Sequence, residues 1–326
     1  MPARHGVLAR ACPVALLLGS VALTPHSLYA KDGDVPVYDI NADPATQIAA
    51  YVNVTGHQRA ADIKRIAIVS FTVEFIDARA TIATPAVASI TITPDLAQLR
   101  PLADALYDLA TEDLRGAGAE VLTRDELIAL PGYAPLKATL AATPYRLERN
   151  DEQGHRTSAV VSAHGLPAYP AAGQAPPATS ETEFARRGRV ALLRAHLVVD
   201  FRTLRDTGER LFHNKRVPKY VETVRVAESC YRLVAPDGSV ATARLKMAVR
   251  APESPVGPSQ PGGAMDEDDS EGAQTDAHIE RLAINPAVYY DQALRYGGAA
   301  QDMLLGALVL QLSSRDSSRQ APSKGK

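Results

Sequence analysis

The stretch KRIAIVSFTVEFID, residues 64–77, constrains the fold more than any other part of the chain. Its β-branched and aromatic residues predict a long β-strand. In the first half both faces are apolar, with Ile66 and Ile68 on one side and Ala67 and Val69 on the other. Alternation of apolar and polar residues begins later. This pattern is typical of a strand that is covered on both sides at one end and half exposed at the other.

Further strands are expected around this one. VASITITP (87–94) predicts a hairpin partner, and the intervening DARATIATPA predicts a long connection. AEVLT is expected to form a short strand, and RVALLRAHLVVDFRTLRD a strand over 189–204. The run from Thr223 to Val249 predicts a β-hairpin that turns at Pro236-Asp237-Gly238, because Asp-Gly sequences suit tight turns.

Helical signals separate these strands. Asp43 and Pro44 predict the cap and first residue of a helix over about 44–53. A second helix is expected to end at Gly116 and Gly118, and Pro101 fits it best if the regular part begins near Arg100. Its apolar face holds Leu99, Leu102, Leu106, Leu109 and Leu114, and its polar face holds Asp104, Asp108 and Glu112.

Two more helices are expected. RDELIALPGYAPLKATL predicts a helix that breaks at Pro131 and resumes. A C-terminal helix has Asn285 as its cap and Pro286 as its first residue, and the pair Gly297-Gly298 is expected to break or thin it.

Together these elements predict an α/β (α+β) fold, a mixed sheet covered by helices with a β-hairpin and two low-complexity insertions. The insertions are Pro-, Gly- and Ser-rich, and the second has too few large apolar residues to offset its chain entropy. The expected parts are a signal peptide at 1–30, the first half of the domain at 31–150, an irregular insertion at 151–187, a β-rich second half at 188–250, a disordered linker at 251–278, a C-terminal helix at 279–313 and a flexible tail at 314–326.

The first thirty residues predict export. Arg4, His5 and Arg10 precede an apolar run, and a polar stretch ends at Ala30, which is the layout of a signal peptide cleaved near Ala30. The apolar run is far shorter than the roughly 20 residues that span a bilayer, so a membrane anchor is not expected. Cys12 precedes the apolar core, which argues against a lipoprotein. The predicted location is the periplasm or the cell exterior.

Charge and cysteine content narrow the function classes. Cleavage removes two arginines and no acidic residue from 35 Lys+Arg and 37 Asp+Glu, which leaves a net charge of −4. This balance argues against nucleic-acid binding and against electrostatic attachment to anionic lipid. Cys230 is then the single cysteine, so no internal disulfide is expected. A buried unreactive thiol is the favoured interpretation, with an intermolecular disulfide or a reactive thiol as alternatives.

Catalytic and metal motifs are missing. GAGAEV follows a predicted helix and enters a strand, the reverse of the order that binds a dinucleotide. MDEDDSEG fails as a calcium loop, because Glu271 stands where glycine is needed. Ser162 and His164 are too close in sequence for a productive nucleophile and base, and His196 is expected to be a structural histidine in a strand. No catalytic, cofactor-binding or metal-ligating residue is assigned, and no cofactor is expected. The other four histidines of the mature chain are scattered: His57, His155, His213 and His278.

The order of elements resembles the curli-secretion lipoprotein (CsgG) family and the amino-terminal domain of TolB. The matching parts are the strand from Arg65 to Phe71, the helix from Leu102 to Leu114, the short strand from Gly118 to Leu122, the helix from Asp125 to Leu130 and the hairpin RLVAPDGSVATARL. The resemblance covers about 150 residues and implies a soluble α/β domain of the cell envelope. It implies no site residues, because it is topological and carries no invariant motif. The lipobox cysteine is missing, so the membrane anchoring of the curli protein is not implied, and residues 72–94 are the single candidate for a pore hairpin.

The leading hypothesis is a non-enzymatic periplasmic protein that binds other envelope components through a sheet edge or through the insertions. The alternative is a periplasmic carrier of a lipid or a small apolar ligand, for which a deep apolar pocket would be evidence. An enzyme is the third hypothesis, and a cluster of His164, His196 or His213 with Asp or Glu in one cleft would be evidence for it. No nucleic acid and no stable membrane insertion are expected.

Overall fold

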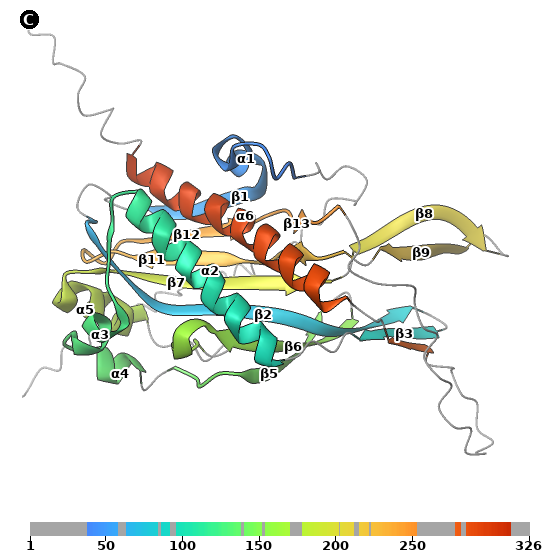
Figure 1. Ribbon diagram of the computed structural model, residues 1–326, viewed down its shortest axis with the longest axis horizontal. Coiled ribbons are helices and arrows are strands. Elements are labelled where there is room, and N and C mark those ends of the chain that lie inside the picture. The colour runs from blue at the N-terminus through green and yellow to red at the C-terminus, as the bar shows by residue number, and fades with distance from the viewer. Residues whose placement is uncertain are drawn as a thin grey trace, which may run out of the picture.

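In the computed structural model, twelve described strands form one mixed sheet, and helices α2 and α6 lie across one of its faces (Figure 1). This arrangement confirms the predicted α/β class.

The residues that the structure describes are 38–57, 63–83, 86–91, 96–137, 140–151, 154–169, 178–201, 203–211, 215–221, 223–252, 278–281 and 285–313. The helices are α1 (Pro44–Tyr51), α2 (Leu96–Gly116), α3 (Arg124–Ala129), α4 (Tyr133–Lys137), α5 (Ala178–Gly188), α6 (Pro286–Ser313) and the short 3-10 turn η2 (Ala163–Gly165). The strands are β1 (Val52–His57), β2 (Arg65–Ala83), β3 (Ala86–Thr91), β4 (Glu120–Val121), β5 (Tyr145–Asp151), β6 (Gly154–Ser162), β7 (Ala191–Asp200), β8 (Thr203–Leu211), β9 (Lys215–Val221), β10 (Arg225–Val226), β11 (Cys230–Val234), β12 (Val240–Leu245), β13 (Val249–Arg250) and β14 (His278–Arg281).

Strand β2 organises the sheet. The main path of the sheet runs β1-β12-β11-β7-β2-β3-β14, and β7 lies parallel to β2. Along one edge β2 pairs first with β7 and then with β3, and along the other edge it pairs first with β4 and then with β6. The predicted strand is therefore central, and its apolar first half is covered on both sides, with Ile66, Ala67, Ile68 and Val69 all buried.

The hairpin of β2 and β3 is confirmed, but the long connection between them is wrong. β2 continues to Ala83, which pairs with Ala86, so two residues separate the strands. The Ala- and Thr-rich segment has weak β-propensity of its own. It extends because β6 pairs with residues 72–80 on one edge and β3 with residues 78–83 on the other.

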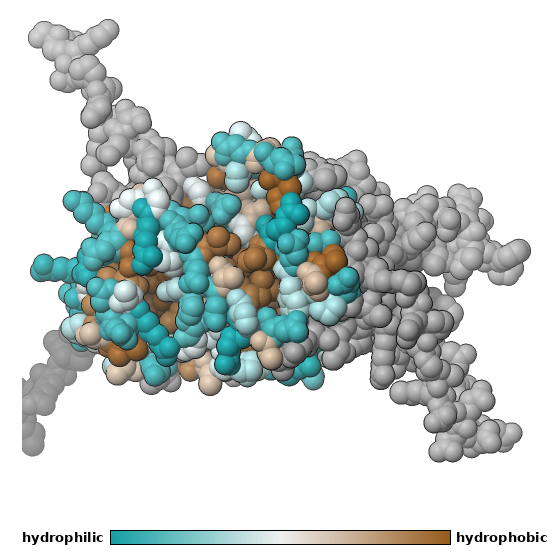
Figure 2. All heavy atoms as spheres, viewed as in Figure 1, coloured by the Kyte–Doolittle hydropathy of each residue, from teal (hydrophilic) through white to brown (hydrophobic). Residues whose placement is uncertain are grey.

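Helices α2 and α6 pack against each other over the sheet. Leu99, Leu102, Leu106 and Leu114 of α2 are buried as predicted, but Leu109 is 38 % exposed. Ala110, four residues after Leu106, takes the inward position instead, because residues four apart share a helix face. Figure 2 shows this side of the molecule, with hydrophobic residues gathered over its middle and hydrophilic residues around them.

The predicted break in α6 at Gly297-Gly298 is wrong, since α6 is continuous from Pro286 to Ser313. A Cβ added at Gly297 would lie 3.1 Å from a terminal carbon of Leu106. The glycine therefore allows α6 to approach α2 closely, and the packing offsets its low helix propensity. The predicted cap is confirmed, because the side chain of Asn285 accepts a hydrogen bond from the backbone of Ala287 at 3.1 Å.

The shorter helices follow their sequence signals. Asp43 caps α1 by accepting from the Ala45 N–H at 2.9 Å. Helix α1 ends at Tyr51, earlier than predicted, because Val52 begins the edge strand β1, which pairs with β12. The predicted short strand appears as β4, and the helix predicted to break at Pro131 appears as α3 and α4.

The prediction of an irregular insertion at 151–187 is wrong. Residues 154–162 form β6, which pairs with β2 and β5, and residues 178–188 form α5. The segment GHRTSAVVS has few large residues and looked like a loop in isolation. Its backbone groups are paired because two neighbouring strands present matching donors and acceptors, a tertiary condition that local composition does not reveal.

The predicted second hairpin is confirmed as β11 and β12, with Gly238 in the turn at φ 84°. Strands β8 and β9 form a separate two-stranded sheet that extends from one end of the molecule (Figure 1). The expected signal peptide (1–30), most of the expected linker (253–277) and the expected tail (314–326) lie outside the described residues. Within the described part of the chain, no helix has both the length and the hydropathy to cross a membrane.

Edge strand β1 contains a glycine that its geometry requires. Gly56 has φ 90°, and a Cβ there would lie 2.1 Å from the backbone oxygen of Val240. Gly56→Ala is expected to lower the free energy of unfolding by more than about 1 kcal/mol, because an L side chain disfavours this backbone region and its Cβ would also overlap the Val240 oxygen. Urea unfolding measures the change. Gly116→Ala is the control, since no atom lies within 4 Å of its added Cβ, and equal effects of the two changes would contradict the prediction.

Candidate functional site

The two faces of the sheet differ in chemistry. On β2, the Phe71 ring packs edge-on against Tyr107 of α2, so Phe71 faces the helices. Thr72 and Glu74 alternate with Phe71 and Val73 and therefore point to the opposite face. That face carries charged residues, and two of its carboxylates are almost wholly buried: Glu74 and Glu181.

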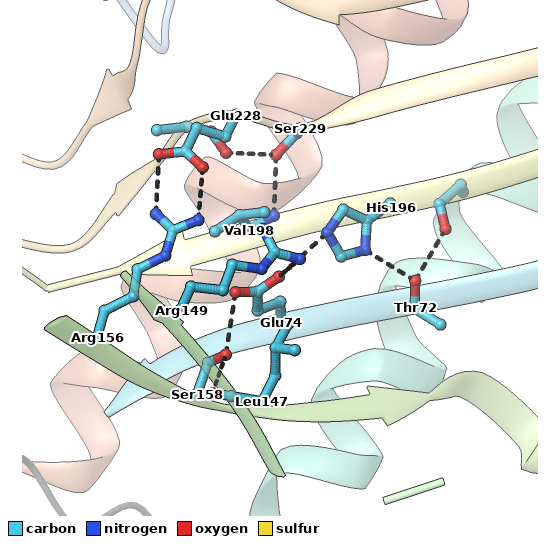
Figure 3. Close-up of polar contacts among 12 residues, drawn as sticks. Thr72, Glu74, Leu147, Arg149, Arg156, Ser158, His196, Val198, Glu228 and Ser229 are labelled. Carbon is cyan, nitrogen blue, oxygen red and sulfur yellow. Dashed lines mark hydrogen bonds and ion pairs between the residues drawn. The ribbon is translucent and has the colours of Figure 1, made fainter. Parts of the chain in front are cut away.

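Glu74 is the centre of a polar network that joins four strands (Figure 3). Its Oε1 accepts a hydrogen bond from the Ser158 hydroxyl of β6 at 3.0 Å. Its Oε2 lies 3.3 Å from Nε2 of His196 on β7 and 3.4 Å from Nη2 of Arg149 on β5. The Glu74 side chain is 0 % exposed, so these partners stand in place of water.

Electrostatics keep this carboxylate ionised. Burial raises the pKa of Glu74, but the hydrogen bond and charge of His196 and the charges of Arg149 and Arg156 lower it by more. The resulting pKa is about 2, below the ordinary value of 4.5. An anion this stable is a poor proton acceptor near neutral pH, which argues against Glu74 as a general base.

His196 has both ring nitrogens engaged. Nε2 faces Glu74, and Nδ1 lies 3.0 Å from the Thr72 hydroxyl, which is also 3.3 Å from the Ala195 carbonyl oxygen. Either tautomer therefore leaves the imidazole without a nitrogen directed at a substrate. His196 lies in a strand, as predicted, and both of its ring nitrogens contact protein atoms.

A second ion pair extends the network to the loop before β11. Arg156, 5 % exposed, donates from both terminal nitrogens to Glu228 at 2.9 and 2.8 Å. Next to it, the Ser229 hydroxyl accepts from the Val198 N–H at 2.9 Å and donates to the Ala227 carbonyl at 3.0 Å (Figure 3). These bonds hold the loop against β6 and β7.

Glu181 of α5 forms the second buried centre. Nη1 of Arg194 lies 3.3 Å from one of its oxygens and Nη2 of Arg232 lies 3.6 Å from the other. The Arg194 guanidinium also lies 3.5 Å from the centroid of the Tyr169 ring, as a cation–π contact. Burial, and then the neighbouring Glu181, raise the pKa of Tyr169.

Four adjacent strands continue this face to the edge of the sheet. Strand register places His196, Cys230, Arg244 and Asn53 in one row and Arg194, Arg232, Thr242 and Thr55 in the next. We call these eight residues the arginine face. None of them is acidic, and Arg244, which is exposed, forms no ion pair with a described residue. The charges that this face presents to solvent are therefore cationic.

Ser162 and His164 are not brought together as a nucleophile and base, but His164 lies beside Asp108 at a pocket, which is the arrangement expected under the enzyme hypothesis. The Ser162 hydroxyl is buried and bonds to the Thr143 hydroxyl, whereas His164 is exposed and its Nε2 lies 3.0 Å from Oδ1 of Asp108. His213 lies outside the described residues. Cys230 is a free thiol on strand β11, as predicted, but it is partly exposed where a buried thiol was favoured. Among the described residues no group of three His, Cys, Asp or Glu side chains could hold a metal ion.

Four residues of this site stand in no recognisable motif of the sequence: Glu74, Glu181, Arg194 and Arg232. Charged residues within an apolar strand sequence indicate such a site, because they are rarely left without partners. Arg194 and His196 stand at alternate positions of ALLRAHLVVD and thus share a face. Which carboxylates they would contact depended on strand order and on the position of α5.

Comparison with known proteins adds no functional assignment. The chain matches no protein-family model, no curated protein and no solved structure.

Proposed function

We propose that this chain is an exported, non-enzymatic protein of the bacterial cell envelope that binds an acidic segment of another envelope protein on its arginine face. The observation that carries the proposal is the asymmetry of the sheet. One face is buried beneath α2 and α6, and the other presents Arg194, Arg232 and Arg244 with no acidic residue among the eight positions. The signal-like residues 1–30 support export.

Charge complementarity defines the partner. Arg194 and Arg232 share one buried carboxylate, so Glu181 cannot neutralise both guanidinium groups. Their side chains remain 23 % and 32 % exposed, and the exposed Arg244 adds a third cation. Guanidinium groups bind carboxylates through paired hydrogen bonds, so Asp- and Glu-rich peptide is the favoured ligand. The outer edge of β1, which pairs with β12 alone among the described strands, offers backbone groups beside this face.

The alternative function, a carrier of a lipid or a small apolar ligand, has less support. Between the sheet and the helices lie large side chains that are fully buried, including Phe71, Leu106, Tyr231 and Tyr289. These described side chains occupy space that an apolar ligand in that layer would need. A lipid recovered in stoichiometric amount by organic extraction of the purified protein would favour the carrier.

Photo-cross-linking in whole cells tests the binding function. A photoreactive phenylalanine at Thr242 lies in the middle of the arginine face, and the same group at exposed Glu112 of α2 is the matched control on the helical face. We expect a discrete adduct from position 242 alone, and the cross-linked peptide of the partner should be rich in Asp and Glu. Adducts of equal yield from both positions, or a contact peptide without acidic residues, would overturn the proposal.

Charge reversal at Arg244 gives a quantitative prediction. Arg244→Glu is expected to weaken binding of the captured partner at least tenfold, because an attraction becomes a like-charge repulsion. Arg100→Glu, at an exposed position of α2, is the control and should leave the affinity unchanged. Calorimetric titration at two salt concentrations measures the loss, which should shrink as salt screens the charges.

A further inference from the structure

A pocket of about 260 Å³ lies on the helical side of the molecule, away from the arginine face. It is formed by the C-terminal half of α2, the start of α3 and the η2 turn. Its lining residues are Tyr107, Asp108, Thr111, Arg115, Leu122, Thr123, Arg124, His164 and Leu166. We propose that this pocket binds a small amphipathic oxyacid, with a carboxylate or phosphate group held by Arg115 and Arg124.

The charge of the lining favours an anion. Arg115 comes from α2 and Arg124 from α3, so the two guanidinium groups reach the pocket from different elements. Arg115 forms no ion pair with a described residue. Asp108 is the single acidic residue among the lining residues, and its Oδ1 lies 3.0 Å from Nε2 of His164. A ligand anion would therefore meet two cations and a carboxylate that already has a partner.

The η2 turn is held in an uncommon backbone conformation at the pocket. His164 has φ 47° and ψ 28°, a left-handed conformation that is costly for a residue with a Cβ. Its N–H donates to Oδ1 of Asp104 at 2.5 Å, and its carbonyl accepts from Nη1 of Arg124 at 2.8 Å. In this conformation the imidazole ring of His164 packs edge-on against the Tyr107 ring, with 5.1 Å between the two ring centroids. A strained backbone conformation that several contacts hold in place is typical of binding sites.

The remaining lining suits a small apolar body. Leu122 and Leu166 are buried, and the Tyr107 ring forms an adjacent wall. The hydroxyl of Thr111 is buried near the phenol of Tyr107, without a well-formed hydrogen bond, so a ligand oxygen would satisfy it. The volume is just below the range of about 300 Å³ and above that drug-sized ligands occupy, which limits the ligand to a small molecule.

Amide chemical-shift titration of the purified protein tests this site with two separate probes, inorganic phosphate and benzoate. We expect saturable shifts at Thr111, Arg115, Arg124 and His164 with at least one probe. Arg115→Gln should weaken that binding about tenfold, as expected for loss of a charged hydrogen bond. Arg100→Gln is the matched control, because it lies on the same helix about 22 Å away at 1.5 Å per residue. It should bind like the parent protein.

A second variant tests the contribution of the His164 imidazole to binding while preserving the backbone conformation of the turn. His164→Asn retains a residue type that tolerates the left-handed conformation but removes the contact with Asp108, so Asp108 should repel the anion and weaken binding. Saturation by phosphate alone identifies a phosphate ester, and saturation by benzoate alone identifies a carboxylate. No saturable shift up to about 10 mM of either probe, or equal affinities of the Arg115→Gln and Arg100→Gln variants, would overturn the proposal.

Discussion

Replacing Glu74 with glutamine is expected to lower the free energy of unfolding by about 3–5 kcal/mol at pH 7, the cost typical of breaking a buried ion pair. Glutamine preserves the shape of the side chain and can still accept from Ser158. It removes the negative charge that faces His196 and Arg149, so these groups would be left partly buried without their counter-ion. The variant should be folded but much less stable.

The pH dependence of this effect follows from the pKa of Glu74, about 2 in the folded protein against an ordinary 4.5. Because the folded-state value is the lower one, the carboxylate stabilises the fold fully above pH 4.5. That contribution is lost as the pH falls from 4.5 toward 2, and the shift corresponds to about 3 kcal/mol. The stability gap between the parent and Glu74→Gln should therefore narrow across this range.

Chemical denaturation at several pH values measures both quantities. Glu148→Gln is the matched control, because Glu148 is an exposed acidic residue on the neighbouring strand β5. The control should change stability by less than about 0.5 kcal/mol. If the free energy of unfolding of Glu74→Gln at pH 7 differed from that of the parent protein by less than about 0.5 kcal/mol, the network would not stabilise the fold.

Replacing Asp302 with asparagine is expected to stabilise the protein above pH 7. Burial, and then the hydrogen bond and the charge of Asp113, raise the pKa of Asp302 from 3.8 to about 7. Asp302 lies on α6 and Asp113 on α2, so two carboxylates meet where these helices pack. Above pH 7 Asp302 is ionised in a partly buried position beside the Asp113 carboxyl group, which disfavours its charge.

The sign of the effect is fixed by the raised pKa. The folded protein holds the Asp302 proton more tightly than the unfolded chain does. The contribution of this proton to the free energy of unfolding is therefore complete below pH 3.8 and is lost as the pH rises through 7. After allowance for solvent screening, Asp302→Asn should gain about 1–2 kcal/mol at pH 8 and almost nothing at pH 4. Asp291→Asn, at an exposed position of α6, is the control. An equal gain at both pH values would contradict the raised pKa of Asp302 as the cause of the effect.

The proposed partner surface and the proposed pocket are independent. The arginine face lies on strands β1, β12, β11 and β7, whereas the pocket lies between α2, α3 and η2 on the other side of the sheet. Arg244→Glu should therefore leave anion binding unchanged, and Arg115→Gln should leave partner binding unchanged. Failure of one proposal would not bear on the other.

Local signals in the sequence determined most of the individual elements. Asp43 and Asn285 supply side-chain oxygens at helix starts, and Gly238 supplies a positive φ at a turn, so each sets its own neighbourhood through short-range geometry. The apolar pattern of residues 64–77 likewise identified the central strand, because burial on both sides requires apolar residues on both sides. These features depend on neighbours in sequence and can be predicted there.

Tertiary structure alone decided the extension of β2 to Ala83, the strand character of 154–162 and the continuity of α6 through Gly297. In each case weak local propensity is overridden by a neighbour that is distant in sequence: β6 and β3 for β2, β2 and β5 for β6, and α2 for α6. The candidate site has the same origin. Glu74 meets His196 across 122 residues of chain and Arg149 across 75, because β2, β7, β6 and β5 assemble side by side. The sequence by itself determined which residues carry charge, and only the order of strands decided which charges meet.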